Sequence, residues 1–106
     1  MVHFSISDAL EELKGIDSPF KMIFQHGSME LEMYKPDKVD MQTPHTRDEL
    51  YIIAEGSGRF VHNTKSVNVS KGDFLFVPAG DEHRFLDFTH DFCTWVVFYG
   101  PEGGED

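Results

Sequence analysis

The chain alternates short strand-like segments with turn residues over most of its length, and this pattern restricts the fold more than any other feature. Short apolar, β-branched or aromatic runs are separated by turn clusters such as Glu55-Gly56-Ser57-Gly58 and Asn63-Thr64-Lys65. Many short strands with regular turn signals are typical of a β-sandwich or a β-barrel. The pattern predicts an all-β fold with strands near residues 20–26, 29–34, 50–54, 59–62, 66–69, 74–77, 83–88 and 92–99.

One short helix is predicted ahead of these strands, over residues 7–15. Ser5 or Ser7 can cap its start, acidic residues fill its first turn, and Gly15 ends it. With 106 residues the chain has the size of one domain with a genuine core. We expect a single domain with a helical segment at about 1–17, a barrel at about 20–99 and an acidic, flexible tail at 100–106.

The charge balance argues against two classes of partner. The net charge is −10 and only nine residues are Lys or Arg. Nucleic-acid binding needs clustered basic residues, and an anionic membrane surface would repel this chain. We therefore expect neither a nucleic-acid nor a membrane partner. The amino terminus lacks an apolar signal-peptide core and no segment is long and apolar enough for a membrane span, so a cytoplasmic location is predicted. The single cysteine, Cys93, is expected to be a buried apolar residue.

Three side chains have spacings that suit a metal site. His45 and Glu49 lie four residues apart, and on a β-strand such residues share a face. His83 follows a turn, a short apolar strand and a second turn, which place it at the start of the next strand. Two imidazoles and one carboxylate can bind a divalent metal and leave coordination positions open for a small molecule. The sequence predicts that these residues converge on one ion.

Each of these three residues also has an ordinary structural interpretation. His45 could be a solvated loop histidine, and His83 could be hydrogen-bonded to a backbone carbonyl at the rim of the barrel. Glu49 could form a salt bridge with Arg47 or Arg84. An inward-pointing carboxylate among aromatic residues is costly unless it is paired or bound to a metal, which favours the metal site.

Residues near Glu49 divide by strand alternation. Asp48 points away from the face of Glu49 and is predicted to be a surface charge. Tyr51 shares the face of Glu49, so it could line the pocket and donate or accept a proton as a catalytic residue, or it could be part of the core. Aromatic residues beyond this segment are expected in the core rather than in a binding platform: Phe74, Phe76, Phe85, Trp95 and Phe98.

The residues following Lys71 resemble the second motif of the cupin superfamily, a group of small jelly-roll β-barrels. That motif is Gly, five residues, Pro, one residue, Gly, two residues, His, three residues, Asn. This sequence has Gly72, Pro78, Gly80 and His83 at those intervals, with Asp87 at the final position. Glycine and proline mark the two ends of a strand here, because glycine allows unusual dihedrals and proline is excluded from central strands.

The first cupin motif matches in part. It is Gly, five residues, His, one residue, His, three or four residues, Glu, six residues, Gly. His45 matches the second His, and Glu49 followed by Gly56 matches the end. Thr43 occupies the position of the first His, and Asp37 that of the leading Gly. The resemblance covers about residues 36–99 and implies a cupin barrel that holds one divalent ion, usually through three His and one Glu. Residues that could replace the missing ligand are Thr43, Gln42, His26 and His62.

The resemblance implies several functions and does not choose among them. Cupins that look similar include dioxygenases, sugar-phosphate isomerases and epimerases, and the implied metal is Fe, Mn, Ni or Zn. The first hypothesis is a metal-dependent oxidoreductase or isomerase acting on a small organic molecule. The second is a non-catalytic module that binds a small ligand or a metal, and the third is an interaction domain with a vestigial cavity. A homodimer is implied by analogy with small cupins.

Overall fold

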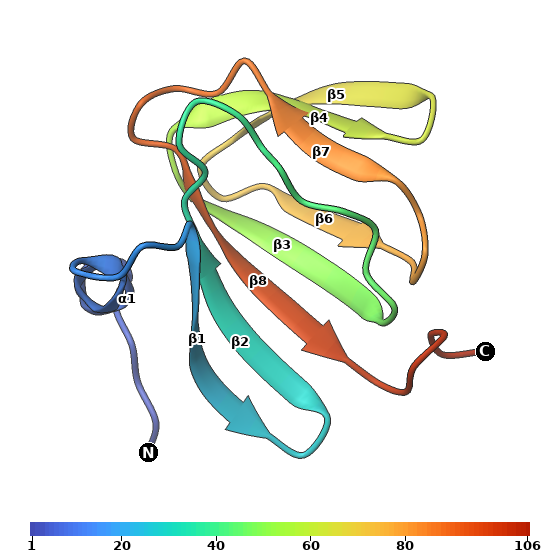
Figure 1. The fold of residues 1–106 in the computed structure, drawn as a ribbon, viewed down its shortest axis with the longest axis horizontal. Helices are drawn as coiled ribbons and strands as arrows, with labels where there is room; N and C mark the ends of the chain where they lie inside the picture. Colours follow the sequence, from blue (N-terminus) through green and yellow to red (C-terminus); the bar gives the residue numbers. More distant parts are fainter.

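A computed structural model describes residues 1–106 and confirms the all-β fold with one short helix. The elements are, in chain order, α1 (Ile6–Leu13), β1 (Phe20–His26), β2 (Met29–Tyr34), β3 (Asp48–Glu55), β4 (Ser57–His62), β5 (Lys65–Ser70), β6 (Phe74–Val77), β7 (His83–Leu86) and β8 (Cys93–Tyr99). All strand pairs are antiparallel, in a five-stranded sheet of order β1-β2-β8-β3-β6 and a three-stranded sheet of order β5-β4-β7 (Figure 1).

Most strand positions agree with the pattern, and the differences have local causes. β1 and β2 have the predicted bounds, joined at a tight turn where Gly27 has φ 59. The strand predicted over 83–88 ends at Leu86, because Asp87 takes φ 52 and turns the chain. This left-handed conformation is tolerated by Asn and Asp better than by most residues, which explains the residue type at the last motif position.

The two sheets enclose one main core. Its largest fully buried members, Tyr51, Phe85 and Phe92, come from both sheets and from the turn before β8, and Phe98 joins them. The core prediction is therefore confirmed for Phe85 and Phe98. It is wrong for Phe74 and Phe76, which are 60% and 44% exposed, because on β6 it is the alternate residues that pack inward.

The helix covers the outer side of the five-stranded sheet. Ser5, rather than Ser7, caps its start: the Ser5 hydroxyl accepts from the Asp8 N–H, and the Asp8 carboxylate accepts from the Ser5 N–H. Ala9 is fully buried in a second cluster with Met33 and Cys93. Trp95 is partly buried against this same cluster. The predicted burial of the free Cys93 is thus confirmed.

The acidic residues of β2 face the inside of the barrel. Met33 packs towards α1, so alternation turns Glu32 to the opposite side, where it pairs with the core residue Val96 of β8. The acid-and-apolar alternation of β2 therefore reflects an outer apolar face covered by α1. Burial, followed by repulsion from Glu30, raises the pKa of the Glu32 carboxyl to about 7.

The carboxyl-terminal segment makes hydrogen bonds to the barrel. The N–H of Gly103 donates to the carbonyl of Thr46 at 2.6 Å, and the N–H of Glu105 donates to Asp48 at 2.8 Å. The Asp48 carboxylate also accepts from the N–H of Ala79 at 2.9 Å. Asp48 is only 5% exposed, so the prediction of a surface charge was wrong: these backbone donors cover it and hold its pKa below the usual range.

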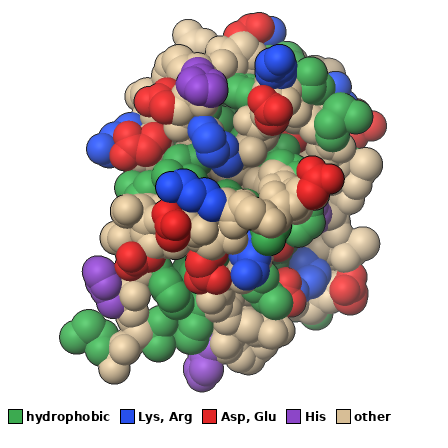
Figure 2. Space-filling model, turned by 60° about the vertical axis from the view of Figure 1, so that its left-hand side comes forward, with side chains coloured by type: hydrophobic (Ala, Val, Ile, Leu, Met, Phe, Trp, Pro, Cys, Tyr) green, Lys and Arg blue, Asp and Glu red, His purple; other side chains and the backbone are tan.

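The charged side chains lie mainly on the surface. On the face shown in Figure 2, Lys and Arg side chains are interspersed with acidic ones and with apolar strips. The structure has no helix with the length and apolar character needed to cross a lipid bilayer.

Candidate metal centre

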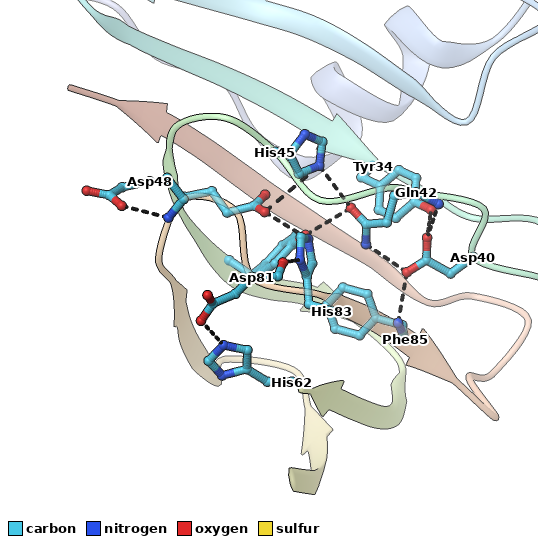
Figure 3. Close-up of polar contacts among 12 residues, drawn as sticks. Tyr34, Asp40, Gln42, His45, Asp48, His62, Asp81, His83 and Phe85 are labelled. Carbon is cyan, nitrogen blue, oxygen red and sulfur yellow. Dashed lines mark hydrogen bonds and ion pairs between the residues drawn. The ribbon is translucent and has the colours of Figure 1, made fainter. Parts of the chain in front are cut away.

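The three predicted ligands converge at one end of the barrel interior. One donor atom from each of His45, Glu49 and His83 lies within 4.8 Å of the others. Nε2 of His83 is 2.8 Å from Oε1 of Glu49, and Nε2 of His45 is 3.9 Å from the same oxygen. Figure 3 shows the two histidine rings approaching each other from different segments of the chain. The three side chains therefore form a group that could hold a metal ion.

Each ligand reaches this point by a different route. Glu49 lies on β3 opposite the core residues Val77 and Phe98. His45 precedes β3 and lies outside any strand, so strand alternation was the wrong reason for its convergence. Its carbonyl accepts from the N–H of Gly80 at 2.7 Å, and its ring lies edge-on to Phe98 at 4.8 Å. This loop thus packs against the turn that leads to His83.

His83 begins β7, and its ring is oriented by the turn before it. Nδ1 of His83 lies 2.9 Å from the carbonyl oxygen of Asp81. A carbonyl can only accept, so Nδ1 carries a hydrogen and the lone pair of the neutral ring is on Nε2, which faces Glu49. Hydrogen bonding of the second ring nitrogen in this way is typical of metal-binding histidines.

The donor atoms are buried without hydrogen-bond partners. Glu49 is 1% exposed and His83 is 5% exposed. Both carboxylate oxygens of Glu49 and Nε2 of His83 lack a hydrogen bond of good geometry, although Nε2 and Oε1 lie 2.8 Å apart, the distance of an ion pair. Buried polar atoms are nearly always paired, and a cation among these atoms would satisfy all of them. The residues therefore fit a divalent metal.

The alternative salt bridges of Glu49 are not formed. Arg47 contacts Glu30 at 3.5 Å and donates to the carbonyls of Gly100 and Ser28. Arg84 is exposed on the outer side of β7. With neither arginine in contact, the ionisable neighbours of Glu49 include the two histidines and the Tyr51 hydroxyl.

The electrostatic environment acts in opposite directions on the two histidines. Burial is the largest influence on His45 and lowers its pKa, which favours the neutral imidazole that a metal requires. Burial also lowers the pKa of His83, but the Glu49 carboxylate and the Asp81 carbonyl together outweigh it, so the pKa of His83 is raised. A proton on His83 is therefore the main competitor of a metal ion.

Of the four residues considered for the missing ligand, one reaches the cluster. Thr43 and His26 are exposed, and His62 contacts Asp81 at 2.7 Å. Oε1 of Gln42 lies 3.4 Å from Nε2 of His45 and accepts from the hydroxyl of Tyr51 at 3.0 Å. Gln42 is therefore the only member of that set in contact with a cluster ligand.

Comparison with known proteins agrees with this geometry. A model of the cupin domain matches residues 30–99, which is more than half of the chain. The chain belongs to the cupin family. Solved cupins share its fold: a cupin-2 domain protein from Shewanella frigidimarina superimposes with a TM-score of 0.70 at 16% identity, covering 92% of this chain and 94% of that one.

Two relatives match different lengths of this chain. The uncharacterized protein SCO3923 of Streptomyces coelicolor is 28% identical over 104 residues, which cover 96% of this chain and 99% of that protein. The acireductone dioxygenase of Drosophila melanogaster is 42% identical over 63 residues, which cover 55% of this chain and 34% of the enzyme. The second similarity is therefore confined to part of the barrel.

Tyr51 is close to the cluster but enclosed by the core. It is fully buried, and burial raises the pKa of its hydroxyl well above the ordinary value. The hydroxyl already donates to Gln42. Its catalytic role stays a prediction, and in this cupin the hydroxyl is a neutral hydrogen-bond donor.

Sequence reasoning missed Asp40, which lies beside the site. Asp40 is 4% exposed, and its carboxylate accepts from the Tyr34 hydroxyl at 2.5 Å and from the Phe85 N–H at 2.8 Å. It also accepts from the backbone N–H and the side-chain amide of Gln42, at 3.0 and 2.7 Å. Nothing in the local pattern distinguishes Asp40 from the other acidic residues of a polar loop, so only the tertiary structure could reveal it.

Access to the cluster is uneven. The side chains of Glu49 and His83 are 1% and 0% exposed, whereas that of His45 is 33% exposed. A cavity of about 240 Å³ is bordered by His83, Gln42 and Thr43. A larger groove of about 660 Å³ between α1 and residues 35–38 contains no cluster residue. A small molecule would therefore reach the site beside His45 and the 42–44 loop.

Proposed function

We propose that this cupin is a metal-dependent enzyme that acts on a small oxygen-bearing organic molecule, with dioxygenase-like chemistry. The observation that carries the proposal is the trio of buried donor atoms on Glu49 and His83 without partners, with His45 beside them. Two histidines and one carboxylate with open positions suit Fe(II) or Mn(II). The partial similarity to an acireductone dioxygenase supports an oxygen-dependent reaction over isomerisation.

In this proposal His45, Glu49 and His83 hold the ion. When bound, the metal supplies Lewis-acid and redox chemistry at the positions that the protein leaves open. The half-exposed side of His45 admits the substrate, while Glu49 and His83 remain shielded from water. The Tyr51 hydroxyl, held neutral by burial, would donate a hydrogen bond and orient the groups next to the ion.

The proposal keeps several expectations from the sequence. The partner is a small molecule, nucleic acid and membranes are not partners, the location is cytoplasmic, and the active form is a homodimer. The oligomeric state is tested by light scattering coupled to size-exclusion chromatography. A mass of one chain at micromolar concentration would contradict the dimer.

Metal content tests the core of the proposal. The protein is purified without a histidine tag and its metals are counted by mass spectrometry. We expect nearly one Fe or Mn per chain, lost in Glu49→Gln and His83→Ala but retained in His26→Ala, a matched control at an exposed histidine. A wild-type protein that binds no added Fe(II) or Mn(II) would rule out the metal centre.

Oxygen uptake then separates catalysis from binding. With Fe(II) restored, the wild-type protein should consume oxygen in the presence of an acireductone, and His83→Ala should not.

One observation favours a second function: Thr43 stands where the family has its first histidine. Metal-loaded protein that binds small enediols without oxygen uptake would favour a non-catalytic ligand-binding module.

A further inference from the structure

The orientation of the Gln42 amide is determined by its neighbours. Its Nε2 lies 2.7 Å from Oδ2 of Asp40, and a carboxylate can only accept. Its other amide atom lies 3.0 Å from the Tyr51 hydroxyl, which donates to an oxygen. The Asp40 contact requires the amide nitrogen to point at Asp40, which leaves the oxygen facing the site, where the Tyr51 hydroxyl can donate to it. Figure 3 shows Gln42 between Asp40 and His45 in this arrangement.

The distances of this oxygen match those of a metal donor. Two atoms that each lie about 2.1 Å from one ion are about 3.0–3.4 Å apart at octahedral or tetrahedral angles. Oε1 of Gln42 is 3.4 Å from Nε2 of His45, which lies within this range, whereas the pairs inside the cluster are 2.8 Å apart for His83 and Glu49 and 3.9 Å apart for His45 and Glu49. The oxygen is therefore spaced from its nearest cluster ligand as a second donor on the same ion would be.

Asp40 holds the Gln42 side chain on the side of the amide that faces away from His45. Besides the Gln42 side chain, its carboxylate accepts from the backbone N–H groups of Gln42 and Phe85 and from the Tyr34 hydroxyl. These bonds join the loop to β2 and β7, so the loop residue that carries the amide cannot shift without breaking them. A donor oriented by a buried hydrogen-bond network is typical of metal sites.

We infer that the side-chain oxygen of Gln42 is the fourth protein donor to the metal, and that Asp40 is the residue that positions it. The inference rests on the proposed metal centre. In the cupin motif the first histidine would stand at position 43, where this chain has Thr43. Gln42, one residue earlier, replaces that histidine as the fourth donor. The site then consists of two imidazole nitrogens, the neutral amide oxygen of Gln42 and the charged carboxylate oxygen of Glu49. This donor set suits a hard or borderline divalent cation.

Titration with Co²⁺ alone tests the inference, because its visible spectrum reports the donor set and its affinity is measured by calorimetry. Gln42→Ala should weaken Co²⁺ binding by about 10–100-fold and change the spectrum. Gln42→Glu keeps an oxygen donor but loses the hydrogen bond to Asp40, so it should bind Co²⁺ more tightly than Gln42→Ala. Thr43→Ala and Gln25→Ala should bind within about twofold of wild type. Gln25 is a matched control, since it is exposed on β1 and its amide contacts only Glu30 of β2.

Urea unfolding of the metal-free variants shows whether a loss of Co²⁺ affinity comes from a general loss of structure. If Gln42→Ala does not fold, Gln42→Leu preserves most of the side-chain volume and should show the same loss of affinity. Asp40→Asn, which can no longer force the amide nitrogen towards itself, should weaken Co²⁺ by about tenfold and alter the spectrum. An unchanged affinity and spectrum in a folded Asp40→Asn would refute the positioning role.

The outcomes distinguish this inference from the proposed function. If His83→Ala loses Co²⁺ but Gln42→Ala and Gln42→Leu keep wild-type affinity and spectrum, the metal centre stands and Gln42 is not a donor. If Thr43→Ala alone changes the spectrum, the fourth donor is Thr43 and the inference is wrong. If His83→Ala also binds as wild type, the metal centre itself is absent.

Discussion

Two buried carboxylates in this barrel have opposite surroundings. Asp40 and Glu49 are 4% and 1% exposed. Asp40 accepts hydrogen bonds from Tyr34, Phe85 and twice from Gln42, whereas neither oxygen of Glu49 has a hydrogen-bond partner. Glu49 has instead the His83 ring at 2.8 Å, which is a charged partner only when protonated. A buried carboxylate without hydrogen bonds is costly, so it persists where another requirement maintains it. The difference marks Asp40 as a structural carboxylate and is consistent with the proposed metal-binding role of Glu49.

The comparison predicts the largest stability loss at Asp40. Asp40→Ala should lower the free energy of unfolding by about 3–5 kcal/mol, because it leaves buried donors on Tyr34, Gln42 and Phe85 without an acceptor. Urea unfolding of metal-free protein measures this. An exposed acid such as Glu102 is the control, and Glu102→Ala should change stability by less than about 0.5 kcal/mol. A similar small effect at Asp40 would remove the distinction between the two carboxylates.

Metal addition should compensate for the missing partners of Glu49. At a concentration about 100 times the Kd, Fe(II) or Mn(II) should stabilise the folded protein by about 2.7 kcal/mol. Thermal unfolding with and without the metal measures the gain, and a chelator should reverse it. Glu49→Gln should show no gain. If the variant gains as much as wild type, the metal binds elsewhere.

A third interior carboxyl, Glu32, extends the comparison to pH. Its pKa is raised from 4.5 to about 7, chiefly by burial, so the folded state favours the protonated form. The stability this provides is complete below pH 4.5 and is lost as the pH rises through about 7. Glu32→Gln should therefore stabilise the protein by about 2 kcal/mol at pH 8, which is less than the full shift would give because water screens the partly exposed carboxyl, and should have no effect at pH 4. Equal effects at both pH values in urea unfolding would contradict this account.

Proton competition at His83 should make metal affinity depend on pH. Its pKa is raised above the ordinary value of 6.5, and a metal can bind Nε2 only after the proton leaves. Affinity should fall about tenfold per pH unit below that raised pKa, so the fall begins above pH 6.5. Co²⁺ calorimetry from pH 8.5 to 5.5 measures the slope. A constant affinity over that range would exclude His83 as a ligand.

The smallest effect concerns Glu49 in the metal-free protein. Because Glu49 makes no hydrogen bond, Glu49→Gln should change the free energy of unfolding at pH 8 by less than about 1 kcal/mol, or raise it. Urea unfolding of both metal-free proteins gives the difference. A loss as large as that of Asp40→Ala would mean that Glu49 has a structural role of its own.

Much of this molecule could be predicted from the sequence because the decisive signals are local. Strand-length apolar runs between turn residues indicate the barrel, and the spacing of His45, Glu49 and His83 within two motifs indicates the cluster. A serine followed by an acid three residues later indicates the start of α1. The strands and the helix start depend on backbone sterics and side-chain alternation, both of which act over a few residues. The cluster was indicated by the motif spacing rather than by alternation, because His45 lies outside any strand.

Other features were decided only by tertiary contacts. Asp48 is covered by backbone donors from Ala79 and Glu105, which lie 31 and 57 residues away. Asp40 and Gln42 belong to a loop with no periodicity, and their roles follow from donors on β2 and β7. The environment of a polar side chain depends on which distant groups the folded barrel brings beside it. The sequence by itself thus determined the fold and the candidate His45, Glu49 and His83 cluster, whereas the tertiary structure decided which buried carboxylate is satisfied by hydrogen bonds and which is not.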